Sequence, residues 1–267
     1  MANDNFLTIS RAECNIAYKE ILINSDQKWK TSELIAETGD YSSACSFAII
    51  STEELVKALI VFFDGQGFNF RNVKGMSTIF RNHRIRYFIL FFLYVMGLFN
   101  DEIRKLMSKV IKKPPVVLTR YNESKMWKKK FQGNVEKYIL QKADELQLEI
   151  ERFSKLDALR QASFYTDYEG SLKSPVTFSK EDFEVFQSRL SQARTAGKGI
   201  MNSFAHADED TMGTIESFKK DFVKQGYYEN IENAFKYMND KRLNPFDAFM
   251  KSVFQIDLDN NKSLQNK

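Results

Sequence analysis

Six polar residues of this sequence have the types and spacing for acid–base chemistry on a phosphate. Four are predicted on inner helix faces and two directly after a helix: Glu54, His83, Asp157 and Arg160, then Tyr165 and Asp167. An arginine beside a histidine or tyrosine and a carboxylate can cut a phosphodiester without a metal ion. The guanidinium stabilises the charge that develops on phosphorus, and an acid–base group moves the protons of the 2′-hydroxyl and the leaving oxygen. The same residue types also suit a buried ion-pair network that only specifies helix packing.

Other catalytic templates are absent from the sequence. There is no GxSxG nucleophile motif, no GxxxxGK phosphate loop and no HExxH zinc motif. His83 and His206 are the two histidines, too few for a histidine-rich metal site. Cys14 and Cys45 form no CxxC pair and resemble small core residues, which is typical of a reducing cytoplasm. We therefore expect no metal and no cofactor.

The helix predicted for Asp40–Phe63 is the element that the rest of the chain surrounds. It runs without Pro or Gly, and it is apolar on most sides, which is typical of a central buried helix. On a helical wheel Glu54 falls inside the apolar face, so we expect a polar group of a neighbouring helix to contact it. Glu53 is expected off that face, paired with Lys57.

The remaining elements are also predicted to be helical, which makes the fold class all-α. Only 4 Pro and 11 Gly occur among 267 residues, and no β pattern is convincing. Ser10 is predicted to cap the first helix through a capping box with Glu13, and Asp40 and Ser179 are predicted N-caps of the helices that follow them. The expected helices cover Ser10–Glu37 (with a break near 24–26 as an alternative), Ser77–Phe99, Asn134–Phe164 and Ser179–Phe204. A loop over 165–175 and shorter helices at about 210–224, 228–239 and 245–255 complete the prediction.

We predict one helical bundle over residues 1–205, with a basic insertion at about 104–130, and a small helical C-terminal extension over 206–267. The most hydrophobic run, Tyr87–Phe99, has 13 residues, whereas a membrane-spanning helix needs roughly 17–25. The N-terminus shows no basic region followed by an apolar stretch, so no signal peptide is expected. These features predict a cytoplasmic protein without a membrane partner.

The insertion at 104–130 is rich in Lys and Arg, and Glu123 is its single acid. Tyr121 and Trp127 lie among the basic residues, a composition typical of a patch that binds phosphates and stacks on bases. A solvated insertion is the alternative. The residues expected to hold an RNA backbone are Lys112, Lys113, Arg120, Lys128, Lys129 and Lys130.

Three blocks of the sequence together resemble the AbiV family of abortive-infection proteins, within the HEPN superfamily of helical bundles. They are GDYSSACSFAIISTEELVKAL (Gly39–Leu59), FRNHRIRYF (Phe80–Phe88) and LRQASFYTDYEGSLKSP (Leu159–Pro175). The resemblance covers roughly Ala12 to Phe204. It implies a HEPN-like bundle that commonly dimerises, and a bacterial phage-defence role. Many HEPN proteins are metal-independent ribonucleases with an Arg-x(4–6)-His motif.

This chain departs from that motif, because the nearest equivalent places Tyr165 where the histidine would follow Arg160. The expected function is therefore a toxin-like antiphage defence protein that acts on RNA or translation, with endoribonuclease activity as one possibility. In that hypothesis Arg160 binds phosphate, Tyr165 and His83 are acid–base or hydrogen-bond partners, and Glu54 or Asp157 orients Arg160. The alternative is a non-catalytic interaction module that binds a phage-encoded or ribosomal protein. A homodimer is expected in both.

Overall fold

The computed structural model describes residues 8–72, 82–110, 141–164 and 177–209. It also describes Phe6, Phe80, two short strands and five positions between 212 and 220. The predicted C-terminal helices at 228–239 and 245–255 lie outside the described residues, as does most of the one at 210–224. Residues 111–140, which hold most of the basic insertion, lie outside them too.

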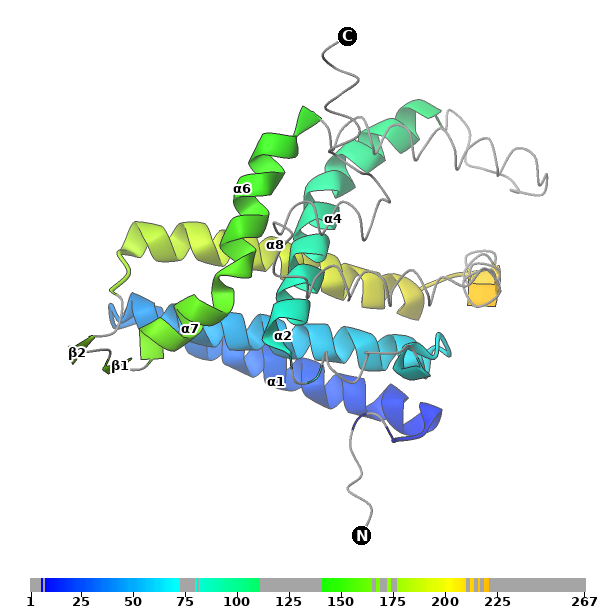
Figure 1. Cartoon of the computed structure of the whole chain (residues 1–267). Helices are drawn as coiled ribbons and strands as arrows, with labels where there is room; N and C mark the ends of the chain where they lie inside the picture. Colours follow the sequence, from blue (N-terminus) through cyan, green and yellow to red (C-terminus); the bar gives the residue numbers. More distant parts are fainter. Residues whose placement is uncertain are drawn as a thin grey trace.

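The described chain is helical, which confirms the all-α prediction. Its elements are α1 (Arg11–Glu37), α2 (Tyr41–Gly65), the 3-10 turn η1 (Phe70–Asn72), α4 (His83–Val110), α6 (Ala143–Ser154), α7 (Leu156–Phe164) and α8 (Lys180–Ala205). Strands β1 (Asp167–Tyr168) and β2 (Leu172–Lys173) form one antiparallel pair within the segment predicted as a loop. In Figure 1, α1 and α2 form a long hairpin, α8 runs along it, α4 crosses α2 and α8, and α6 crosses α8.

The helix starts follow the predicted capping signals. Ser10 and Glu13 form the capping box of α1, with Glu13 Oε2 2.6 Å from Ser10 N. Asp40 caps α2, and Ser179 caps α8 in a second capping box. Helix α1 runs unbroken through residues 24–26, because Ser25 directs its hydroxyl at α2 instead of competing for its own backbone.

Two of the predicted helices differ from those in the structure. Helix α4 begins at His83 instead of Ser77, and residue 80 is a turn whose carbonyl accepts a hydrogen bond from Arg86 Nη1 at 3.0 Å. It also continues beyond Phe99 to Val110. The single helix predicted up to Phe164 is interrupted at Lys155. The interruption allows α6 to pack on α4 while α7 packs on α2, so one apolar stripe covers two partners.

Helix α2 is the central element, as predicted: most of its residues are buried against α1, α4, α7 and α8. Small residues bring α1 and α2 close together. Ser25 and Ser51 each donate a hydrogen bond to the other's backbone carbonyl, both at 2.7 Å. None of the described helices has the length and hydropathy that a membrane-spanning segment needs.

A buried arginine connects α8 to this hairpin. Arg194 Nη1 donates to Ser25 Oγ at 2.8 Å, and Nη2 contacts Asp26 at 2.5 Å. The guanidinium also stacks 4.6 Å from the centre of the Trp29 ring. This side chain thereby fixes the position of α8 on α1 and α2, because its N–H groups bind Ser25 and Asp26 while the plane of the guanidinium packs on Trp29.

Candidate active site

The carboxylate at the centre of the polar cluster belongs to Glu53. Only 6% of its side chain is exposed, and it lies between α2 and α4. The pairing with Lys57 was predicted for Glu53, but in the structure it belongs to Glu54. Glu54 lies 2.5 Å from Lys57 and accepts from Asn24 of α1 at 3.3 Å. A polar group of a neighbouring helix does contact Glu54, but the glutamate that faces His83 is Glu53. Adjacent helical residues differ by about 100°, and the apolar surface of α2 is too wide for a wheel to decide between them.

Three side chains of α4 contact Glu53: Arg86 and Tyr87 donate to it, and His83 donates in the tautomer that carries a proton on Nδ1. The Tyr87 hydroxyl lies 2.5 Å and His83 Nδ1 2.8 Å from Glu53 Oε1, and Arg86 Nη2 lies 3.0 Å from Oε2. His83, Arg86 and Tyr87 are spaced i, i+3 and i+4, so they share one face of the first turns of α4. The buried carboxylate is therefore compensated by a cation and by directed hydrogen bonds, which a buried charge requires.

Tyr87 acts in this cluster as a hydrogen-bond donor. Burial raises the pKa of its phenol well above the ordinary value, and the charge of Glu53 raises the pKa further. The hydroxyl therefore keeps its proton at neutral pH and holds one oxygen of Glu53 in place. It is buried, so it supports other groups instead of meeting a substrate.

His83 carries two contacts on one ring nitrogen. Its Nδ1 lies 2.8 Å from Glu53 Oε1 and 2.6 Å from Arg86 Nη2. A protonated Nδ1 donates to Glu53 and leaves Nε2 as an acceptor, whereas an unprotonated Nδ1 accepts from Arg86 and leaves the proton on Nε2. Because 35% of the side chain is exposed, His83 can exchange protons with a bound molecule. The choice of partner at Nδ1 sets whether Nε2 is a hydrogen-bond acceptor or donor.

Arg160 reaches the same carboxylate from α7. Its Nε lies 4.0 Å from Glu53 Oε1, and its Nη2 donates to Asp157 Oδ1 at 2.9 Å. The Arg160 Nε atom is buried and has no hydrogen-bond partner among the described residues. Burial lowers the pKa of Arg160, but the hydrogen bond to Asp157 and the charge of Glu53 outweigh it and raise the pKa. The guanidinium is fully charged, and 17% of the side chain is exposed.

The structure thus brings together three of the six predicted site residues: His83, Arg160 and Asp157. Glu54 does not join them. Tyr165 lies outside the described residues, and the Asp167 side chain is not described although its backbone forms part of β1. The prediction missed Glu53, Arg86 and Tyr87. The available signal was the spacing of Arg86 and Tyr87 from His83, which places all three on one helix face.

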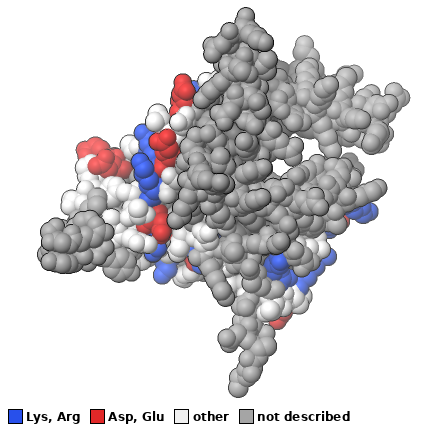
Figure 2. Space-filling model, in the orientation of Figure 1, with Lys and Arg blue, Asp and Glu red and all other residues white. Residues whose placement is uncertain are grey.

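The predicted RNA-binding residues all fall outside the described residues: Lys112, Lys113, Arg120, Lys128, Lys129 and Lys130. On the face shown in Figure 2, described basic and acidic residues alternate along one stripe, and basic residues also gather at the lower right of the view. Ion pairs connect the helices: Arg189 of α8 lies 2.7 Å from Glu149 of α6, which also contacts Arg152. Within the described part of the chain, no three His, Cys, Asp or Glu side chains gather as metal ligands would.

A protein-family model, HEPN_AbiV, described as AbiV, matches residues 13–195. The matched range extends from the first turn of α1 into α8 and includes the residues around Glu53. No curated protein and no solved structure gives a match.

Proposed function

The chain belongs to the AbiV family of HEPN proteins, and from this premise we propose that it is an abortive-infection protein that cleaves RNA without a metal ion. The observation that carries the proposal is the convergence of His83 and Arg160 on one buried carboxylate. The two residues come from different helices and lie 2.8 Å and 4.0 Å from Glu53 Oε1. An imidazole and a charged guanidinium held together and partly exposed are the two groups that metal-independent phosphodiester cleavage needs.

In the proposed reaction the ribose 2′-oxygen attacks the adjacent phosphorus, and the bond from phosphorus to the 5′-oxygen breaks. His83 takes the 2′-hydroxyl proton at Nε2 when Nδ1–H donates to Glu53. Arg160 stabilises the negative charge on the phosphate oxygens, with Asp157 orienting the guanidinium. The Tyr165 hydroxyl is assigned the transfer of a proton to the leaving 5′-oxygen, and the resulting phenolate regains a proton from solvent while His83 releases the one it accepted. The products are a 2′,3′-cyclic phosphate and a 5′-hydroxyl.

The proposed partners follow from this chemistry. RNA is the substrate, and the lysines and arginine of the basic insertion supply contacts to its backbone. A homodimer and a phage-encoded or ribosomal protein as trigger or target are further parts of the proposal.

The test is incubation of the purified full chain with total bacterial RNA in the presence of EDTA, beside Arg160→Ala and His83→Ala. Arg152→Ala is the matched control, because Arg152 is an exposed arginine of α6 in a comparable i,i+3 ion pair. We expect cyclic-phosphate ends from the parent and the control, and a loss of at least a hundredfold in both site variants. Cleavage that survives in Arg160→Ala would refute the proposed role of this arginine.

A second candidate function, a non-catalytic interaction module, is favoured by the depth of the cluster. Arg86, Tyr87 and Glu53 are nearly inaccessible, and Glu53 accepts hydrogen bonds from both of the others, as expected where ion pairs specify helix packing. The two functions differ at Arg160→Ala. If Arg160 is catalytic, the variant loses cleavage and keeps near-parental thermal stability. If Arg160 is purely structural, the variant loses thermal stability and its cleavage activity is the same as that of the parent.

A further inference from the structure

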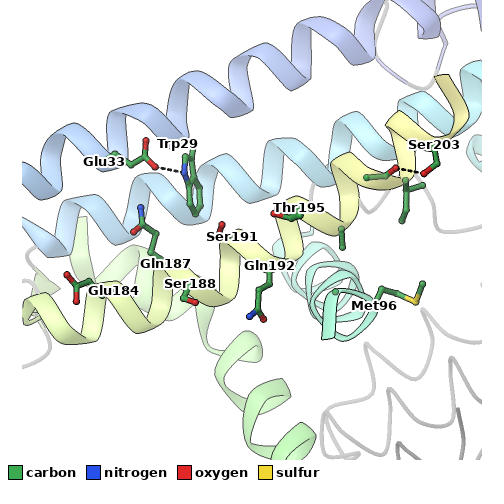
Figure 3. Close-up of a pocket in the computed structure, with 14 residues that line it drawn as sticks. Trp29, Glu33, Met96, Glu184, Gln187, Ser188, Ser191, Gln192, Thr195 and Ser203 are labelled. Atoms are coloured by element: carbon green, nitrogen blue, oxygen red, sulfur yellow. Dashed lines mark hydrogen bonds between the residues drawn. The ribbon is translucent and has the colours of Figure 1, made fainter. Parts of the chain in front are cut away.

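A long groove follows the outer face of α8, and none of its lining residues belongs to the Glu53 cluster. Its volume is about 780 Å³. It runs from Glu184 to Ser203, which corresponds to about 28 Å along a helix at ~1.5 Å per residue. Figure 3 shows Trp29 and Glu33 of α1 at one side and Met96 of α4 at the other. We call this feature the α8 groove; its length suits a chain segment better than a small molecule.

The floor of the α8 groove lacks side-chain volume. Ser191, Thr195, Gly199 and Ser203 recur every four residues and form one ridge of small residues. A Cβ atom placed on Gly199 would have no atom within 4 Å. Large apolar side chains brought in by another helix would therefore fill space that the groove leaves empty.

The polar groups with recorded bonds in the α8 groove are already satisfied within the protein. Ser203 Oγ donates to Gly199 O at 2.8 Å, and Trp29 Nε1 donates to Glu33 Oε1 at 2.8 Å. The charged residues among its described lining are Glu33 and Glu184, both acidic, which disfavours a nucleic-acid backbone. Most of its described lining is polar, and the large apolar side chains that a docked helix could contact there are Trp29, Met96 and Ile200.

The chain itself carries a segment with the matching pattern. In residues 245–255, four large apolar side chains stand at i, i+3, i+4 and i+7 on one helical stripe: Phe246, Phe249, Met250 and Val253. Asn244 followed by Pro245 is a strong helix start, because Asn is a favoured N-cap and Pro a favoured first residue. Such a stripe needs a surface to cover it.

The described chain also ends close to one mouth of the groove. Phe204, next to Ser203, packs its ring on Phe62 at the C-terminal end of α2. Lys219 donates to the carbonyl of Gln66 at that same end. The 24 residues of 221–244 are ample to lead from there to any point of the groove, and attachment to the same chain gives a high effective concentration.

We propose that residues 245–255 of the same chain bind in the α8 groove as a helix, with Phe246, Phe249, Met250 and Val253 facing the small residues of α8. The groove is thus an internal docking surface for the C-terminal extension.

The test measures maleimide labelling of a thiol introduced into the groove of the full-length chain by Thr195→Cys. Val185→Cys is the control, since Val185 lies on α8 outside the groove and is 52% exposed. The two native cysteines are buried and do not compete. We expect the Thr195→Cys thiol to react at least tenfold more slowly than the control, at every protein concentration.

Adding Phe249→Asp should restore the labelling rate of the Thr195→Cys thiol, whereas Lys251→Asp, off the apolar stripe, should not. Circular dichroism confirms that each variant is folded. Labelling as fast as the control would show an open groove and overturn the proposal. Protection that disappears on dilution would assign the groove to a second copy, and protection that survives Phe249→Asp would assign it to another occupant; both also overturn it.

Discussion

Replacement of Glu53 by Gln tests whether this carboxylate organises the cluster. The change keeps the shape of the side chain and an oxygen that can accept from Tyr87, but it removes the charge that compensates buried Arg86. Breaking a buried ion pair on one side costs about 3–5 kcal/mol of unfolding free energy. At about 2–4 °C per kcal/mol for a chain of this size, the melting temperature should fall by about 6–20 °C.

Glu54→Gln is the matched comparison, one residue away on the same helix. Its partner Lys57 is 22% exposed, and a partly exposed pair contributes about 0–1 kcal/mol. Denaturant unfolding followed by circular dichroism gives both free energies. If Glu53→Gln and Glu54→Gln lower stability to the same extent, the assignment of the buried carboxylate to Glu53 is refuted.

A double-mutant cycle then isolates the ion pair. Arg86→Gln alone should also destabilise strongly, because Glu53 loses its cationic partner. The double variant Glu53→Gln/Arg86→Gln should be more stable than the sum of the single effects predicts, by about 0.5–3 kcal/mol, since no buried charge remains unpaired. Additive single effects would show that the two side chains are not energetically coupled.

Three further predictions concern packing and reactivity. Gly197→Val should lower stability by about 1–3 kcal/mol in thermal unfolding, because even a Cβ atom there would lie 3.3 Å from two core leucine side chains. Arg194→Lys should destabilise by about 1–3 kcal/mol, since an ammonium cannot reproduce the guanidinium fork or its stacking on Trp29; tryptophan fluorescence in denaturant measures this. Burial raises the pKa of Cys45 to about 12, so its thiol stays protonated, and iodoacetamide at pH 8 should modify it only after unfolding.

Local signals in the sequence predicted much of the fold. These signals are the caps at Ser10, Asp40 and Ser179 and the continuous apolar surface of α2. They can be recognised in the sequence because a capping box or an apolar stripe forms from residues only a few positions apart. The break at Lys155 is different. The stripe continues across it, and only the presence of two partners, α4 for α6 and α2 for α7, bends the chain there.

The candidate site shows the same division. Residue types and spacing alone selected His83, Asp157 and Arg160 as polar groups on inner helix faces. The tertiary structure chose Glu53 over Glu54, because which of two adjacent glutamates is buried depends on where α4 and α7 cross α2. A wheel gives the angle between side chains of one helix, whereas the meeting of groups 30 and 107 positions apart is decided by how the helices pack.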